Sequence, residues 1–364
     1  METEYMQIPT AALHQWVVEL FLAIGSEQRE AQLTADHLIG ANLAGHDSHG
    51  VGMAPRYVLS WKAGELQLNQ RVAIEQDSGT MLTVDARCGM GQAVTQEAMA
   101  LAIERAQAHG VCIMGLKNTH HLGRVGHWAE QAIAAGMVSV HFVSVCSMPI
   151  VAPHGGREAR FSTNPFSVGI PVPGRPPVLL DFATSAIALG KVRVAHNKKI
   201  PVPPGSLLDS EGRPTRDPGV MFPPDGGARG AMLPFAGHKG FALAMVCELL
   251  AAALTGGRAS LPANMTQGVW NNMLAVVFDP QRMGTADLFS EEVQAYVDWV
   301  RSAPLAQDSD GILLPGEPER RSRLARAELI PVDAGTVAQL DAAAATVMEQ
   351  TGRSPGPVSA LQRE

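Results

Sequence analysis

The segment 164–192 places the strongest constraint on how this chain can fold. A short extended run ends at Phe182, and the small residues Ala183–Ser185 lead directly into a helical run. The N-terminus of a helix offers backbone N–H groups without partners, and small side chains let a ligand approach them. The segment indicates either a ligand site at a strand–helix junction or an ordinary junction in which Thr184 or Ser185 caps the helix.

Apolar periodicity divides the rest of the chain into helical and extended segments, which is typical of an α/β protein. Residues 197–237 are rich in proline and glycine, and we expect a long wrapping connection there instead of a packed element. The tail after Gly352 is expected to be loose. Helices are predicted near 10–24, 26–44, 55–62, 91–105, 125–135, 186–195, 240–254, 291–301 and 336–350, and strands near 80–86, 110–116, 137–145, 177–182 and 273–278.

The run Gly89-Met-Gly91 before the fourth helix half-resembles a dinucleotide-binding turn. Val94 occupies the position of the third glycine, and the strand that follows ends at Lys117-Asn118 instead of an acidic residue. Close packing of a helix on a strand explains the glycines equally well. We therefore do not predict a Rossmann fold.

Composition limits the partners and the compartment. The chain has 364 residues and a net charge of −7, without a run of Lys or Arg that could bind nucleic acid. Its first 30 residues lack the pattern of a signal peptide, and its longest apolar run, 241–254, is too short to cross a membrane. Its four scattered cysteines favour reduced thiols in the cytoplasm.

Four more segments complete a recognisable set with the one around Asp181. They are Gly45–Val51 (GHDSHGV), Asn118–Gly123 (NTHHLG), Phe235–Gly240 (FAGHKG) and Leu314–Glu317 (LPGE). In this order they resemble the malate/L-lactate dehydrogenase family that is distinct from the common Rossmann-type dehydrogenases. That family includes ureidoglycolate, sulfolactate and diketogulonate oxidoreductases and reductases of cyclic imino acids. The resemblance extends from about Leu33 to about Glu317.

The resemblance implies a non-Rossmann nucleotide-binding fold, in which helices flank a mixed, largely antiparallel sheet. It also implies two domains, one that combines residues 1–118 with 281–364 for substrate binding and dimerisation, and a central cofactor domain at 119–280. The expected protein is a homodimer with its site near the interface. Its expected reaction is NAD- or NADP-dependent hydride transfer to a 2-oxo acid or a cyclic imino acid, or the reverse oxidation.

The resemblance also suggests the residues that handle substrate. His121 and His49 are the candidates for proton transfer, with His121 slightly favoured, and Ser48 is a candidate to bind substrate or hold the ring. Many members carry an arginine for the substrate carboxylate at the position of Met53. Here Arg56 or Arg124 could replace it, as could Arg193. His46 and Asp47 are expected to be surface or helix-capping residues. The cofactor-binding candidates are Ser147, Asp181, Phe182, Ala183, Lys239, Gly316 and Glu317.

Two other classes of function compete with this interpretation. His46, His49, His120, His121 and His127 could furnish zinc ligands in a metal-dependent hydrolase or lyase, although His-x-x-His is a loose pattern. A non-catalytic scaffold is the second alternative. It would leave unexplained why histidines, a lysine and small residues gather at the ends of elements, where function tends to lie.

Overall fold

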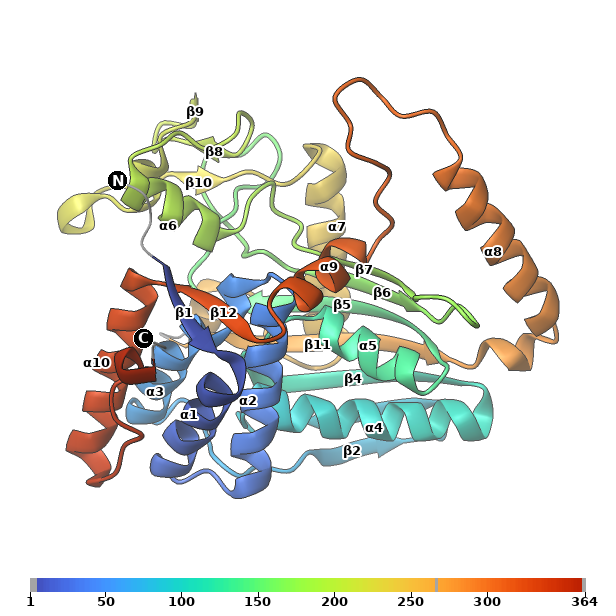
Figure 1. Cartoon of the computed structure of the whole chain (residues 1–364), viewed down its shortest axis with the longest axis horizontal. Helices are drawn as coiled ribbons and strands as arrows, with labels where there is room; N and C mark the ends of the chain where they lie inside the picture. Colours follow the sequence, from blue (N-terminus) through green and yellow to red (C-terminus); the bar gives the residue numbers. More distant parts are fainter. Residues whose placement is uncertain (1–4, 266–267, 362–364) are drawn as a thin grey trace.

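The computed structural model describes residues 5–265 and 268–361, and a seven-stranded sheet forms its centre (Figure 1). The order of the strands is β2-β3-β4-β11-β5-β6-β7. β3 and β4 pair in parallel, and the other neighbours in this sheet pair antiparallel. The predicted mixed, largely antiparallel sheet is therefore confirmed. The strands are β2 (Ala73–Asp77), β3 (Met81–Asp85), β4 (Val111–His120), β5 (Val138–Cys146), β6 (Phe166–Ile170), β7 (Val178–Phe182) and β11 (Trp270–Phe278).

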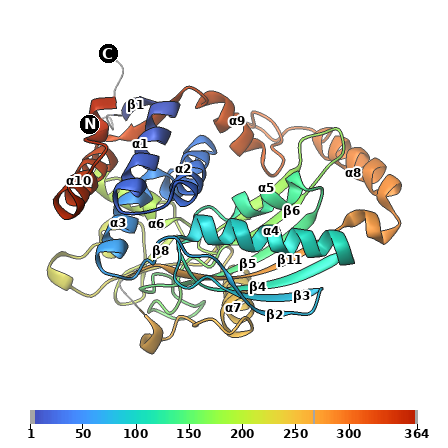
Figure 2. The same cartoon turned by 90° about the horizontal axis from the view of Figure 1, so that it is seen from below.

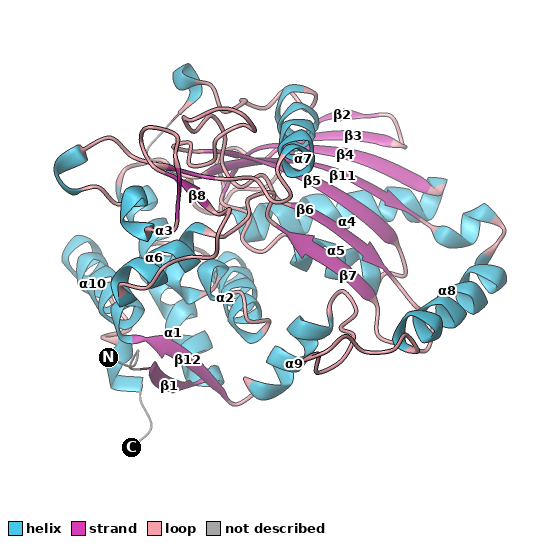
Figure 3. Ribbon diagram, turned by 90° about the horizontal axis from the view of Figure 1, so that it is seen from above, coloured by secondary structure: helices cyan, strands magenta, loops and turns pink. Residues whose placement is uncertain are grey.

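Helices cover the two faces of this sheet unequally (Figures 2 and 3). α4 (Gly91–His109) and α5 (Gly126–Ala134) lie on one face, where they bury apolar side chains such as Met114 and Trp128. The other face carries α7 (His238–Glu248), which continues as a π-helical turn over Leu249–Ala253. Much of this second face has no covering layer in Figure 3.

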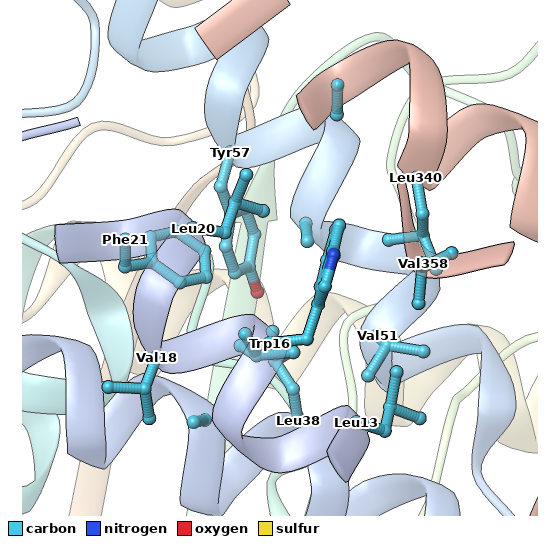
Figure 4. Packing of buried hydrophobic residues seen from close by; sticks show 14 of the residues in the cluster. Leu13, Trp16, Val18, Leu20, Phe21, Leu38, Val51, Tyr57, Leu340 and Val358 are labelled. Carbon is cyan, nitrogen blue, oxygen red and sulfur yellow. The ribbon is translucent and has the colours of Figure 1, made fainter. Parts of the chain in front are cut away.

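A second core joins the two ends of the described chain. β1 (Tyr5–Pro9) pairs with β12 (Leu329–Asp333), and four helices pack around this ribbon (Figures 1 and 4). Trp16 in this core donates its indole N–H to the backbone oxygen of Gly356, 2.9 Å away, and Val358 is fully buried. The expectation of a loose tail is therefore wrong for residues 353–361, and residues 362–364 lie outside the described chain. The four helices are α1 (Thr10–Ala23), α2 (Gln28–Leu43), α3 (Ala54–Lys62) and α10 (Ala334–Thr351).

The proposed division into two domains remains a prediction. The second core draws on residues 8–93 and 330–358, in keeping with a unit made from both ends of the chain. However, β2, β3 and β4 precede or end near residue 118 and belong to the same sheet as β5, β6 and β7.

The stretch 197–237 is not the unpacked connection that its proline content suggested. It contains a small sheet of strand order β10-β8-β9, and Leu207, Met221 and Met232 within it are fully buried. These side chains form a cluster with residues of α6 (Leu189–Lys198). The apolar residues between the prolines point inward, so the stretch has a core of its own. The strands are β8 (Leu207–Leu208), β9 (Pro214–Thr215) and β10 (Ala231–Met232).

The junction after β7 also differs from its simplest interpretation. α6 begins at Leu189 instead of residue 186, and the backbone of Ala188 precedes it without a side-chain cap. Thr184 donates its hydroxyl to the backbone oxygens of Thr163 and Asn164, and Ser185 donates to the backbone oxygen of Ile187. Neither residue caps a helix, so the ordinary-junction alternative is wrong and 183–188 is an irregular segment.

Two further helices complete the chain. α8 (Ala286–Arg301) lies at the side of the molecule, and α9 (Glu317–Ala325) follows the Leu314–Glu317 loop (Figure 1). Sequence analysis did not predict α9. None of the residues of α9 is buried, so the helix has no apolar stripe that periodicity could detect.

The glycines before α4 serve the packing of this helix. A Cβ on Gly91 would overlap the backbone oxygen of His121, and a Cβ on Gly89 would lie 2.7 Å from Val94 Cγ1. The backbone N–H of His120 donates to the oxygen of Gly89, 3.2 Å away. The N-terminus of α4 therefore lies directly against the His120–His121 backbone, as the close-packing explanation predicted.

We expect Gly91→Ala to lower the free energy of unfolding by about 1–3 kcal/mol, because the added methyl group forces backbone apart in a tightly packed site. Urea denaturation measures the effect. Gly40→Ala in α2 is the matched control, because a Cβ there meets nothing within 4 Å. The control should raise stability by about 0.5–1 kcal/mol through its better helix propensity. Equal stability of Gly91→Ala and the unaltered chain would contradict the packing argument.

Candidate active site

Several strand ends meet at one edge of the large sheet. Trp270 begins β11 and pairs with His120 at the end of β4 on one side and with Cys146 at the end of β5 on the other. Phe182 ends β7 and pairs with Phe166, the first residue of β6. The sequence-predicted segments around His121, Ser147 and Ala183 follow these strands directly, so they leave the sheet at the same edge.

A bulge in β11 shapes the loop that carries His120 and His121. The β4–β11 ladder is irregular between Asn271 and Met273. At this point Asn271 Oδ1 accepts the backbone N–H of Leu122 at 2.9 Å, and Asn272 Oδ1 accepts that of Asn118 at 3.0 Å. Side-chain amides thus replace the backbone ladder where β4 ends, and they hold the histidine loop in place.

The loop that carries Ser48 and His49 is fixed from two sides. Asp47 accepts hydrogen bonds from Asn42 in α2 and from Arg326 beyond α9, each at 2.7 Å. His46 lies 3.2 Å from Glu319 of α9. His46 and Asp47 therefore hold the loop, close to the expected surface role. Ser48 Oγ lies 3.0 Å from His49 Nδ1 and can orient the ring.

His49 and His121 come together although 72 positions separate them in the sequence. Their rings stack with centroids 5.7 Å apart and an interplanar angle of 18°. His121 Nδ1 lies 2.7 Å from the hydroxyl of Tyr57, and Gln92 donates its amide to that hydroxyl and to the backbone oxygen of His121. His120, the preceding residue, is buried with its ring edge-to-face against Tyr57 at 5.3 Å.

Burial keeps these rings neutral near pH 7. It lowers the pKa of His49 to about 4, with help from the charges of His46 and Arg124. It also lowers the pKa of His121 well below its usual range, to which His49, His120 and Arg56 add. The same burial, with Arg56, lowers the pKa of His120 to about 4. A neutral imidazole carries one proton, so it can donate at one nitrogen and accept at the other.

The two arginine candidates occupy different environments. Arg124 is 2% exposed, and it pairs with Glu130 and lies 3.7 Å from Asp181. Arg323 of α9 binds the same Glu130 at 3.0 Å, so the buried Arg124 belongs to a charge network that extends to the surface. Arg56 is exposed and near enough to His120 and His121 to lower their pKa values. Arg193 lies over the ring of Phe222.

Asp181 is turned away from the other cofactor candidates. Successive residues of a strand point to opposite faces, so Asp181 and Phe182 face opposite sides of β7. The Asp181 carboxylate accepts the backbone N–H of Gly126 at the start of α5, and burial raises its pKa. The structure therefore places Asp181 in the charge network with Arg124 and does not bring it to Phe182.

Phe182, Ala183 and Lys239 lie near one another around Phe235. The rings of Phe182 and Phe235 meet edge-to-face at 5.3 Å, and the backbone N–H of Phe235 donates to the oxygen of Thr184. Lys239 follows four residues later in the first turn of α7 and is exposed. Ser147 is half-buried just beyond β5.

The segment after Ala183 connects this cluster with the histidines. It ends at Gly190 in the first turn of α6, where an added Cβ would lie 3.1 Å from Cβ of Ser48. A side chain there would force Ser48 to shift by a few tenths of an ångström. Gly190 thus brings α6 against the Ser48–His49 loop.

Gly316 and Glu317 lie at the outer edge of β7. Gly316 has a φ of +89°, and an added Cβ would lie 3.1 Å from Cβ of Leu179. Leu179 donates its N–H to the oxygen of Pro315, and Glu317 pairs with Arg301 and accepts the N–H of Leu314. The loop therefore extends the edge of the sheet near Asp181, and Glu317 is already bound within it.

The zinc alternative lacks a ligand set in the described part of the chain. No group of three or more His, Cys, Asp or Glu side chains there has an arrangement that could hold a metal ion. His49 and His121 stack face to face, and Tyr57 occupies Nδ1 of His121.

Among the described helices, none combines the length and apolar character needed to cross a membrane.

Sequence reasoning missed Tyr57 and Gln92, which both contact His121. Tyr57 lies on the buried side of α3, and Gln92 follows Gly91 at the start of α4. Neither belongs to a motif, and the only available signal was a glutamine at an otherwise apolar helix start.

Known proteins are similar to this chain over most of its length. Residues 8–341 match the sequence model described as malate/L-lactate dehydrogenase. Hydroxycarboxylate dehydrogenase B of Escherichia coli O157:H7 is 48% identical over 328 residues, which cover 89% of this chain and 90% of the relative. L-lactate dehydrogenase of Cupriavidus necator is 39% identical, with 90% and 94% covered. A solved structure of a candidate malate/lactate dehydrogenase from E. coli has a TM-score of 0.90 and 44% identity, with 98% of each chain covered.

Buried neutral histidines should make the protein unstable in mild acid. Below the unfolded pKa of about 6.5 the unfolded chain takes up protons that the folded chain does not, so stability falls as pH falls through this window. His141 in β5 is fully buried, and burial lowers its pKa to about 3. We expect His141→Gln to reduce the slope of the free energy of unfolding against pH by about 1.4 kcal/mol per pH unit between about pH 6 and 4. Urea denaturation at several pH values measures it. Stability that stays constant from pH 7 to 5 would contradict the argument.

Proposed function

The chain belongs to the malate/L-lactate dehydrogenase family, and we propose that it transfers hydride between a nicotinamide nucleotide and the second carbon of a 2-hydroxy or 2-oxo acid. The stacked pair of His49 and His121 beside an exposed arginine carries this proposal. Hydride transfer to a carbonyl needs a proton donor at the oxygen and a cation for the substrate carboxylate. The histidine pair and Arg56, whose charge acts on His121, would supply these two kinds of group.

His121 and His49 are the proposed catalytic residues. Each has a nitrogen held by a hydroxyl, Tyr57 for His121 and Ser48 for His49, which orients the ring and leaves the other nitrogen for substrate. A neutral ring with its proton on the free nitrogen can donate a hydrogen bond to the carbonyl oxygen during reduction, whereas a ring whose free nitrogen is unprotonated can receive the hydroxyl proton during oxidation. We keep His121 as the first candidate for this step because it is the more buried of the two.

Arg56 is the proposed anchor for the substrate carboxylate. It lies in the first turn of α3, three positions after Met53, and near His120 and His121. A guanidinium can bind a carboxylate through two parallel hydrogen bonds. Arg124 is a weaker candidate for this role, because Glu130 and Asp181 already engage its charge.

The proposed nucleotide site lies around Phe182, Ala183, Lys239 and Ser147. A bound nicotinamide would supply or accept the hydride. The residues present fit such a group, because an exposed lysine in a first helical turn suits a diphosphate and half-buried aromatic rings suit a planar ring. Gly316 and Glu317 could border it at the edge of β7. The nucleotide is NAD or NADP. The free cysteines fit a cytoplasmic location.

We expect His121→Ala and His49→Ala each to lower turnover by about 10²–10⁴-fold while nucleotide affinity stays nearly unchanged. Oxidation of NADH and NADPH, followed at 340 nm over a panel of 2-oxo acids and cyclic imino acids, measures turnover. Fluorescence titration measures nucleotide binding. Near-normal turnover in both variants would refute the catalytic assignment, and failure to bind either nucleotide would refute the function.

We also propose that the protein is a homodimer that pairs through the open face of its large sheet. On this face the outward residues of β5, β6, β7 and β11 are mostly apolar, whereas the α5 side of β5 and β6 carries Ser139, His141 and Ser167. A strand that is apolar on its outward side needs a cover there. The outward members include Ile113, Val140, Val168, Ile170, Leu180, Val276 and Phe278.

The outer side of α7 and its π-helical continuation extends this apolar surface. Met245, Val246 and Leu249 are 53%, 41% and 51% exposed and recur at helical spacing. Strands about 4.8 Å apart and about 20 Å long give the four strands β11, β5, β6 and β7 a footprint of about 400 Å². This is about half of the roughly 800 Å² that each partner buries in a stable dimer, and the outer side of α7 adds to it. An apolar patch suits a second copy of itself better than a charged partner.

This interface lies in the central segment instead of the N- and C-terminal segments that the domain division assigned to dimerisation. Apart from Ile113 of β4, the apolar surface is on β5, β6, β7, β11 and α7, all between residues 119 and 280.

Sedimentation equilibrium should give the unaltered protein a mass of twice 38.6 kDa. Leu249→Glu combined with Met245→Glu should produce a folded monomer, because it buries charge in the paired surface. Leu324→Glu on α9 is the control, because Leu324 is 81% exposed and lies away from this face. A monomeric unaltered protein, or a double variant that remains dimeric, would overturn the proposal.

A further inference from the structure

Tyr57, Gln92 and His121 form a closed ring of hydrogen bonds beside the proposed reaction centre. The Tyr57 hydroxyl lies 2.7 Å from His121 Nδ1, and Gln92 Nε2 lies 2.9 Å from that hydroxyl. The same Gln92 nitrogen lies 3.2 Å from the backbone oxygen of His121, so the chain of bonds starts and ends on one residue. All three residues are buried, with exposed fractions of 0%, 1% and 9%.

Chemistry fixes the direction of each bond in this ring. A backbone carbonyl oxygen only accepts, so Gln92 must present its NH₂ group to His121. The opposite orientation of the amide would set two oxygens against each other. Gln92 therefore also donates to the Tyr57 oxygen. Within the part of the chain that the structure describes, His121 Nδ1 is the remaining partner of the Tyr57 hydroxyl, which donates its proton there.

We infer that Tyr57 and Gln92 are positioning residues that hold His121 in the tautomer with its proton on Nε2. Because Nδ1 accepts from Tyr57, a neutral ring must carry its hydrogen on the other nitrogen. This inference deepens the proposed function and rests on it for its catalytic meaning. It makes His121 a hydrogen-bond donor to the carbonyl oxygen, where negative charge develops as hydride arrives.

The packing around the ring keeps this arrangement rigid. The Tyr57 ring contacts the edge of His120 on one side and lies near Phe21 in the second core (Figure 4). Gly91 brings the start of α4, and with it Gln92, against the His121 backbone. The groups that act on the His121 ring are the hydroxyl of Tyr57, the ring of His49 and the charges of His120 and Arg56. None of these is a carboxylate that would attract a second proton.

Nitrogen-15 NMR of histidine-labelled protein tests the tautomer without any substrate. His121 signals are assigned by their loss in His121→Asn. In the unaltered protein we expect a protonated Nε2 and an unprotonated Nδ1. Gln92→Glu should reverse the assignment, because its carboxylate accepts the Tyr57 proton and leaves the Tyr57 oxygen to accept from Nδ1–H. A protonated Nδ1 in the unaltered protein, or no change in Gln92→Glu, would overturn the inference.

Kinetics of Tyr57→Phe separates positioning from a structural role. We expect kcat to fall at least about tenfold with nucleotide affinity unchanged, since the ring loses its fixed tautomer. The acid limb of the pH profile should move to higher pH by about one unit, because a hydrogen bond to the neutral ring no longer opposes protonation. Tyr296→Phe, at an exposed tyrosine of α8, is the matched control and should leave both unchanged.

The outcomes distinguish this inference from the proposed function. Unchanged kcat and an unchanged pH profile in Tyr57→Phe would refute the positioning role while the dehydrogenase activity stands. Absence of activity in the unaltered protein would refute the function, whereas the NMR result would still decide the tautomer. Circular dichroism and urea denaturation of Tyr57→Phe and Gln92→Glu confirm that each variant is folded before it is compared.

Discussion

The insertion of β11 between β4 and β5 is the constraint on which the site depends. This strand, from residues 270–278, aligns the ends of two strands that lie more than 120 residues earlier in the chain. Its two asparagines then replace the ladder with side-chain amides, which fix the turn from β4 into the histidine loop. A hydrogen-bonded amide in a buried position contributes about 1 kcal/mol, but an unpaired one costs more, so these contacts tolerate little change.

A partly buried charge network ties the other elements to this frame. Arg124 of the histidine loop, Glu130 of α5, Arg323 of α9 and Asp181 of β7 lie in one continuous set of contacts. Removing charges from water is expensive, so such a network adds less to stability than its Coulomb attraction suggests. Its effect is specificity, because each charge has a partner only when α5, α9 and β7 are correctly placed.

The sequence predicted those parts of the molecule whose signal is local. Helices such as α1 and α10 have clear apolar spacing, and the meeting of His49 with His121 followed from the family resemblance. Arrangements that depend on contacts between distant segments could not be predicted in this way. The family resemblance implies that Asp181 binds cofactor, and in the structure its carboxylate lies against Gly126 of α5 and Arg124, on the side of β7 opposite to Phe182. Tyr57 and Gln92 acquire a role only through the fold, and α9 is a polar helix that its ion pairs hold.

α9 also determines when the site can become ordered during folding. The loop that carries His49 is held by Glu319 and Arg326, which follow His46 and Asp47 by 273 and 279 positions. Contacts with such long sequence separation form late, because a large loop must close first. During synthesis the loop must wait for nearly the whole chain to emerge from the ribosome. A nascent chain can therefore build its helices and much of its sheet while it remains without a rigid Ser48–His49 loop.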